Sequence, residues 1–364
     1  MHHPPLLPWH IDAPHESAIL GELALESGEV IHDYRQSFVT HGHLDVDRSN
    51  VILVCAAITG THHRLDHLIG RGRALDPERW FIVATDPIGN GLSTSPSNSH
   101  AQPGAGFPRY TIRDMVGAQR RLLAEGLGID RVAAVVGASM GGMQALQWAV
   151  SHPSVVGAVV ALTAPGRTSA WSIAVNEATR ACLMADAAWN GAEFVARPER
   201  GWRAWTLVQR MLMSRSPDVV AALPPDPPAI IAAGNALVGA TQASDFDALD
   251  FIYQSWAYDA HDVGCTAGFG GDTEAALASI SSPALLLAPP LDLYNPAHDV
   301  RSTSRMIKNG TFVEIPSRHG HQSTANACAA DSIFLNGEID RFFRASHERF
   351  YRRAAAGSAA IASR

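Results

Sequence analysis

A serine between two glycines is the residue of this chain best suited to chemistry. The segment VVGASMGG, residues 135–142, places Ser139 between Gly137 and Gly141, directly after an apolar run. Where G-x-S-x-G joins a strand to a helix, it forms a sharp turn that exposes the serine hydroxyl at the helix N-terminus. Backbone N–H groups there favour developing negative charge. Ser139 is therefore a candidate nucleophile, and an ordinary strand-to-helix turn is the alternative.

Two later segments offer the partners that such a serine needs. A serine hydroxyl is a poor nucleophile until a base takes its proton, and a carboxylate must orient that base. Asp292 follows one apolar run in ALLLAPPLDLYNP, and His321 follows the next in FVEIPSRHGHQS. Ser, Asp, His is also the chain order of serine hydrolases built on doubly wound sheets. Asp299 and His319 are the alternatives by proximity.

Stabilising an oxyanion requires two backbone N–H donors. One donor is expected to be Met140, the residue after the serine. The other is expected in the loop after the apolar run 51–58, where the candidates in AAITGTHH are Ile58 and Thr59. Only main-chain atoms act at such a site, so the residue types carry little information.

The remaining pattern predicts the elements that position these residues. The alternating segment 28–42 predicts an antiparallel hairpin at a sheet edge. Helical periodicity predicts helices over 111–128 and 141–153. Short apolar runs predict buried parallel strands, and they cover residues 51–58, 80–89, 131–139, 155–164, 283–290 and 311–317. Strands alternating with helices predict a doubly wound α/β fold with a mostly parallel sheet.

The alternation of strands and helices stops between residues 166 and 275. This stretch contains helical patterns such as WSIAVNEATRACLMADAAWNG and no convincing strand pattern. We therefore expect a core formed by residues 1–165 and 276–364, with residues 166–275 inserted as a helical lid over the carboxyl ends of the strands.

Composition and charge exclude several classes of function. The chain has 364 residues, of which 46% are hydrophobic and 17% charged, and a net charge of −7. Its basic residues are dispersed, which argues against nucleic acid as a partner. No apolar run approaches the roughly 18 residues that would predict a membrane span. The N-terminus lacks the pattern of a signal peptide, and the four scattered cysteines form no CxxC, so a cytoplasmic protein is expected.

Histidine-rich segments at 40–43, 61–63 and 318–321 raise the question of a metal site. No H-E-x-x-H and no convincing carboxylate cluster accompanies them, so the sequence predicts no metal site. Neither G-x-G-x-x-G nor a phosphate-binding loop is present, and no nucleotide cofactor is predicted.

Longer motifs carry a family resemblance. The segments GASMGGMQALQWA and FPRYTIRDMVGAQRRLL resemble the homoserine O-acetyltransferase family of the α/β-hydrolase superfamily. The resemblance covers most of the chain. It implies an α/β-hydrolase fold, Ser139 as nucleophile with Asp292 and His321 as partners, and Ile58 and Met140 as oxyanion donors.

The chain also departs from the usual family pattern around the acceptor pocket. Residues 86–98 read DPIGNGLSTSPSN where acetyltransferases usually have a GST-GP segment, and residues 249–264 replace an RFDANSY-like stretch. Gln322 follows the histidine where the family usually has aspartate. These features resemble the branch of the family that hydrolyses simple esters. Arg215, in contrast, aligns with an arginine that binds the acceptor in acetyltransferases.

The sequence thus favours hydrolysis of small acetyl-type esters through an acyl-enzyme, with no cofactor. The alternative is O-acetyl transfer to homoserine or a similar alcohol, with acetyl-CoA as co-substrate; a non-catalytic binding protein is a third hypothesis. Tyr253 and Trp256, in the aromatic-rich insertion, are candidate substrate contacts, although aromatic residues there are also expected to pack the core of the lid. The family resemblance further implies a homodimer formed through the lid helices.

Overall fold

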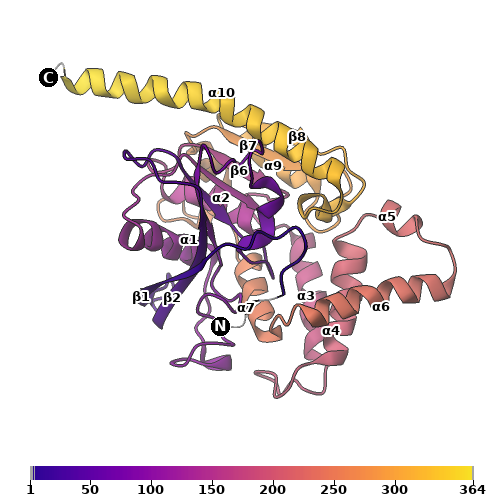
Figure 1. Ribbon diagram of the computed structural model, residues 1–364. Coiled ribbons are helices and arrows are strands. Elements are labelled where there is room, and N and C mark those ends of the chain that lie inside the picture. The colour runs from indigo at the N-terminus through magenta and orange to yellow at the C-terminus, as the bar shows by residue number, and fades with distance from the viewer. Residues whose placement is uncertain (1–2, 4, 363–364) are drawn as a thin grey trace.

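A single eight-stranded sheet organises the protein, in the order β1-β2-β4-β3-β5-β6-β7-β8. The computed structural model describes residues 3 and 5–362 and is drawn in Figure 1. Strands β3 to β8 run parallel, while β1 and β2 are antiparallel to their neighbours. The strands are β1 (His15–Ala24), β2 (Val30–His41), β3 (Val51–Cys55), β4 (Phe81–Thr85), β5 (Ala134–Ala138), β6 (Val159–Leu162), β7 (Ala284–Ala288) and β8 (Gly310–Glu314).

Both faces of strands β3 to β7 are buried, which explains why these strands are continuous apolar runs. Leu53 points into a core shared with α1 (Ile112–Arg121) and α2 (Met140–Ser151). Its neighbour Ile52 points into a second core, shared with α10 (Ala329–Ala362) on the other face. This arrangement confirms the predicted doubly wound α/β-hydrolase fold.

The predicted hairpin at 28–42 is wrong in its boundaries. Residues 30–41 form one strand, β2, which pairs with β1 upstream of the predicted segment. The turn lies at the start of that segment, where the Gly28 N–H donates to Leu25 O over 3.0 Å and Gly28 has a φ of 86°. Glycine adopts this conformation without strain. The alternation belongs to a single half-buried strand, so it does not mark two.

Between β6 and β7 the described chain forms helices, as predicted for the lid. Figure 1 shows α4, α5 and α6 projecting to one side of the sheet. Trp202 and Trp205 pack with Phe251 in a small core of this region, so they serve packing there. The boundaries of the core and the lid stay predictions. The helices are α3 (Ala170–Met184), α4 (Glu199–Thr206), α5 (Pro217–Ala221), α6 (Pro227–Ala243), α7 (Ala248–Asp259) and α8 (Thr273–Ala278), and α9 (Ala297–Met306) follows β7.

We examined the helices for one that could cross a membrane. Among residues 3 and 5–362, none of them is both long enough and apolar enough to span a bilayer.

Candidate active site

Ser139 occupies a strained turn between β5 and α2. Its φ of 56° and ψ of −124° lie outside the regions that non-glycine residues ordinarily adopt. The Ser139 N–H donates to Leu162 O over 2.8 Å, which fixes the turn to the neighbouring strand. Backbone strain of this kind persists only where the surroundings enforce it, and it clusters at functional sites.

The two glycines of the motif allow the close packing that this turn requires. A Cβ on Gly137 would lie 2.1 Å from Gly141 O, and a Cβ on Gly141 would lie 2.1 Å from Cys55 O. Both contacts are with backbone, which cannot move aside without displacing α2 or β3. The glycines therefore let α2 start directly against β3 and β5.

Asp292 and His321 meet as the sequence predicted. His321 Nδ1 and Asp292 Oδ2 lie 2.8 Å apart, and both side chains are buried. The other carboxylate oxygen, Oδ1, accepts the N–H groups of Tyr294 and Asn295 over 2.9 and 2.8 Å. The carboxylate is thus held in one orientation, with one oxygen on the imidazole. His321 Nε2 is left to act as a base.

The two alternative residues are engaged elsewhere. His319 Nδ1 lies 2.7 Å from Asp331 Oδ2 on α10. Asp299 lies on α9, where its carboxylate is 3.3 Å from the exposed His298. The geometry therefore favours Asp292 and His321 over both alternatives.

Ser139 and His321 border the same pair of tyrosines. The rings of Tyr258 and Tyr294 stack with centroids 5.5 Å apart, and Tyr294 meets His321 edge-on at 5.1 Å. Burial raises the pKa of Tyr258, while hydrogen bonding to Asn295 and the nearby Ser139 hydroxyl act in the opposite direction. The Ser139 hydroxyl is buried and lies near the Tyr258 hydroxyl, and no hydrogen bond joins it to His321 among the described residues. Catalytic hydrogen bonds are often long before substrate binds.

The predicted oxyanion loop is held by a residue of α7 that the sequence did not single out. Gln254, on α7, accepts the Thr59 N–H over 2.9 Å and donates to Ile88 O over 3.3 Å. Because this bond engages the Thr59 N–H, Ile58 is the better of the two candidate donors. Met140 is the first residue of α2, at the positive end of the helix dipole.

Asn295 connects the loop that carries Asp292 to α7 and to the end of β6. Its Oδ1 accepts the Tyr258 hydroxyl over 2.7 Å, and its Nδ2 donates to Thr163 O over 2.6 Å. Asn295 follows the candidate triad residue Asp292 by three positions and donates its N–H to that carboxylate. This spacing is the signal in the sequence that could have identified Asn295.

Arg215 lies beside the histidine loop. Gly320, with a φ of 60°, packs so closely that a Cβ would lie 2.9 Å from Ser216 N and 3.1 Å from Arg215 C. The Gln322 N–H donates to Ser214 O over 3.1 Å. The segment 214–216 and the His321 loop therefore form one packed unit.

A second arginine, Arg210, is close to Arg215. Burial lowers the pKa of Arg210, and the positive charge of Arg215 lowers it further. Arg210 Nη1 donates to the Thr241 hydroxyl over 3.0 Å. Within the described part of the chain, neither arginine forms an ion pair with a carboxylate. Two neighbouring guanidinium groups without a counter-ion favour an anionic ligand.

Tyr253 and Trp256 line a different pocket from the one at the triad. They border a cavity of about 590 Å³ together with Phe107, Arg109 and Trp189, and no triad residue lines it. The Tyr253 hydroxyl donates to Phe107 O over 2.9 Å, and the Arg109 guanidinium lies 3.6 Å from the Trp256 ring centroid. Their role as substrate contacts stays a prediction.

Comparison with known proteins identifies the family of this chain. Residues 50–212 match the model of the alpha/beta hydrolase fold. The chain is 34% identical to a homoserine O-acetyltransferase of Chlorobaculum tepidum, over 83% of this chain and 87% of the relative. The chain belongs to the homoserine O-acetyltransferase family. It is an enzyme of this type, as the sequence motifs predicted.

Two further similarities are to proteins with other activities in their names. A homoserine O-succinyltransferase of Leptothrix cholodnii is 32% identical, over 83% of this chain and 89% of the relative. An acetylester hydrolase structure from Corynebacterium glutamicum superposes with a TM-score of 0.83 at 27% identity, covering 91% of this chain and 96% of that one. Proteins similar to this chain therefore include ones named for acyl transfer and one named for ester hydrolysis.

Proposed function

We propose that this enzyme transfers an acyl group through an acyl-enzyme formed on Ser139. His321 Nε2 takes the serine proton as the hydroxyl attacks the acyl carbonyl, and later returns it to the leaving group. Asp292 holds the imidazole in the tautomer that this step requires. The Ile58 and Met140 N–H groups stabilise the negative charge of the tetrahedral intermediate.

We propose that the acyl acceptor is a small alcohol with a carboxylate, of which homoserine is the example, and that acetyl-CoA is the donor. The observation that carries this proposal is that the Arg215 backbone lies against the His321 loop, while its guanidinium, near that of Arg210, has no carboxylate partner among the described residues. A carboxylate bound there would bring the alcohol of the same molecule to the acyl-enzyme. Arg210 would add a second positive charge.

The names of the curated relatives support this acceptor more than water, although the sequence alone favoured ester hydrolysis. Hydrolysis remains the second candidate, because the acetylester hydrolase from Corynebacterium glutamicum has the same fold over most of its length. Gln322 and the altered segment 86–98 are the sequence features that favour it.

The test is an acceptor-dependence experiment. The purified protein is incubated with acetyl-CoA, with and without homoserine, and separately with a simple acetate ester. Homoserine-dependent release of CoA with formation of the O-acyl product supports transfer. Rapid ester cleavage that homoserine does not change, together with no acceptor-dependent CoA release, would refute transfer and favour hydrolysis.

Substitution of Arg215 tests the acceptor site itself. Arg215→Ala is expected to raise the KM for homoserine at least roughly tenfold, since hydrogen bonds between charged groups contribute about 1.5–3 kcal/mol. Ester cleavage should change little because water needs no carboxylate site. Arg203→Ala is the matched control: Arg203 is exposed on α4 and donates to Asn235 Oδ1 over 2.8 Å. An equal loss in both variants would contradict the assignment.

A cytoplasmic location and a homodimer formed through the lid helices stay predictions of the sequence. Analytical ultracentrifugation of the purified chain tests the dimer, because a monomer at all concentrations would rule it out.

A further inference from the structure

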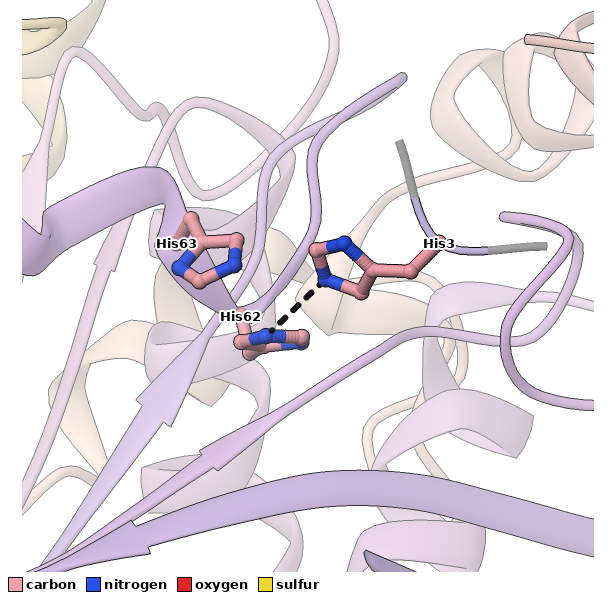
Figure 2. A group of neighbouring side chains, drawn as sticks. All are labelled: His3, His62 and His63. Atoms are coloured by element: carbon pink, nitrogen blue, oxygen red, sulfur yellow. Dashed lines mark hydrogen bonds between the residues drawn. The ribbon is translucent and has the colours of Figure 1, made fainter. Parts of the chain in front are cut away.

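Histidines distant in the sequence converge beside the loop that follows β3. His62 and His63 begin the 3-10 turn His62–Leu68, and His3 reaches them from the N-terminal segment. One ring nitrogen of each residue lies within 4.8 Å of the others. Figure 2 shows the three imidazoles arranged around a common space, with the rings of His3 and His62 joined by a 3.4 Å contact between their Nε2 atoms.

A carboxylate contacts the Nδ1 atom of each of the two adjacent histidines. His62 Nδ1 lies 2.9 Å from Asp86 Oδ2, and His63 Nδ1 lies 2.7 Å from Asp66 Oδ2. Because each carboxylate engages Nδ1, the nitrogen left available on each ring is Nε2. Histidine ligands of metals commonly donate their second N–H to a carboxylate, which fixes the tautomer and increases the basicity of the ligating nitrogen.

The polar atoms of this cluster are incompletely satisfied by protein groups. His63 Nε2 is buried and makes no hydrogen bond within the part of the chain that the structure describes. Leaving such an atom without a partner costs about 1–3 kcal/mol. The His10 ring stacks on the His63 ring, with centroids 4.2 Å apart and an angle of 6° between the rings. This stacking fixes the orientation of the His63 imidazole and of its Nε2 atom.

The separation of the His3 and His62 nitrogens fits two neighbouring ligands of a tetrahedral ion. Zn–N bonds of about 2.0–2.1 Å at tetrahedral angles place neighbouring ligand nitrogens roughly 3.3–3.4 Å apart. His3 Nε2 and His62 Nε2 are separated by 3.4 Å. Imidazole ligands suit zinc, copper, nickel and iron, whereas magnesium and calcium prefer oxygen.

We propose that His3, His62 and His63 bind one Zn²⁺ ion, with Asp86 and Asp66 orienting the two adjacent ligands. Water completes the tetrahedron. Such an ion would fasten the N-terminal segment to the loop that carries Ile58, four residues before His62 in the chain. The site is independent of the acyl acceptor proposed above, and no step of the reaction passes through the ion.

Two other groups of potential ligands are less suited. In the group of His15, His62 and Asp86, the carboxylate already accepts hydrogen bonds from both rings. In the group of His319, Cys328 and Asp331, the His319 Nδ1 is used by Asp331. Neither group combines a buried unsatisfied nitrogen with a supporting carboxylate, as the group around His63 does.

Zinc binding by the full-length, tag-free chain tests the proposal. The protein is treated with a chelator, dialysed, and titrated with zinc chloride in a calorimeter, and bound metal is measured by atomic emission. One zinc per chain is expected, together with a rise in Tm because the ion binds only the folded state. Asp66→Asn is expected to weaken binding about 10–100-fold.

Ligand variants decide whether the ion is at this site. His63→Ala and His3→Ala should each weaken zinc binding at least roughly tenfold, while His319→Ala, from the competing group, should leave it unchanged. If His63→Ala does not fold, His3→Ala remains decisive because His3 lies in the terminal segment. Substoichiometric binding by the wild type would overturn the proposal, as would unchanged binding by His3→Ala or a loss found only in His319→Ala. Absorption of the cobalt-loaded protein should show a tetrahedral ligand field.

Discussion

Replacing Asp292 with asparagine should abolish most activity through the tautomer of His321. Asparagine keeps the size of the side chain but offers one acceptor oxygen and one NH₂ group. At this position Oδ1 accepts two backbone N–H groups, from Tyr294 and Asn295. The amide oxygen must stay there, because turning the amide would direct NH₂ at two donors and lose two buried hydrogen bonds, each at about 1–3 kcal/mol.

The NH₂ group then faces His321 Nδ1, which must become an acceptor. The proton of the neutral imidazole moves to Nε2, and this nitrogen can no longer take the Ser139 proton. The same substitution in another serine-histidine-aspartate enzyme lowers kcat by about 10⁴. A similar loss here corresponds to roughly 5.4 kcal/mol of transition-state stabilisation.

The assay is kcat for acetyl-CoA turnover or for cleavage of an acetate ester, whichever the wild type performs. Asp299→Asn is the matched control, since Asp299 was the other candidate in the sequence, and it should retain nearly full kcat. A loss of less than tenfold in Asp292→Asn, with a large loss in Asp299→Asn, would refute the reasoning.

Three further predictions follow from individual contacts. Gly141→Ala should destabilise the fold by roughly 3 kcal/mol or prevent folding, because the new Cβ would lie 2.1 Å from a carbonyl oxygen of β3. Gly117→Ala is the control: it lies on α1 with no atom within 4 Å of the new Cβ, and it should be neutral or stabilising. Urea unfolding of the two variants measures the difference. Gln254→Ala should lower kcat about tenfold with little change in KM by releasing the Thr59 N–H, and Gln254→Glu should recover part of it by restoring an acceptor. Burial raises the pKa of Asp250 well above its usual value, so its contribution to stability is full at low pH and is lost as the pH rises above about 3.9. Asp250→Asn should remove this loss, and an unchanged pH dependence of Tm would contradict the assignment.

Local pattern was sufficient to predict the parallel strands and the contact between Asp292 and His321, while the triad as a whole stays a prediction. Strands β3 to β7 lie within the predicted apolar runs because burial on both faces demands continuous hydrophobic residues, and β8 begins one residue before its predicted run. Chain order and strand ends were sufficient to select Asp292 and His321. Proximity alone could not exclude His319, because the contact that occupies it comes from Asp331 on α10.

Long-range packing determined what the sequence could not predict. Gln254 reaches the oxyanion loop from 195 positions away, and no local spacing signals such a contact. The pair His62–His63 was visible in the sequence, but Asp86 and His3 join it only through the fold. The prediction of no metal site therefore rested on local motifs, and the proposed zinc site is the opposing hypothesis.

Mass spectrometry of the acylated enzyme tests the central claim most directly. The protein is mixed with acetyl-CoA or an acetate ester, quenched in acid before deacylation, and digested. We predict one acetyl group on the peptide that contains Ser139, and no acetyl group and no turnover in Ser139→Ala. Turnover that persists in Ser139→Ala, or an acyl group trapped on another residue of the active wild type, would contradict the account.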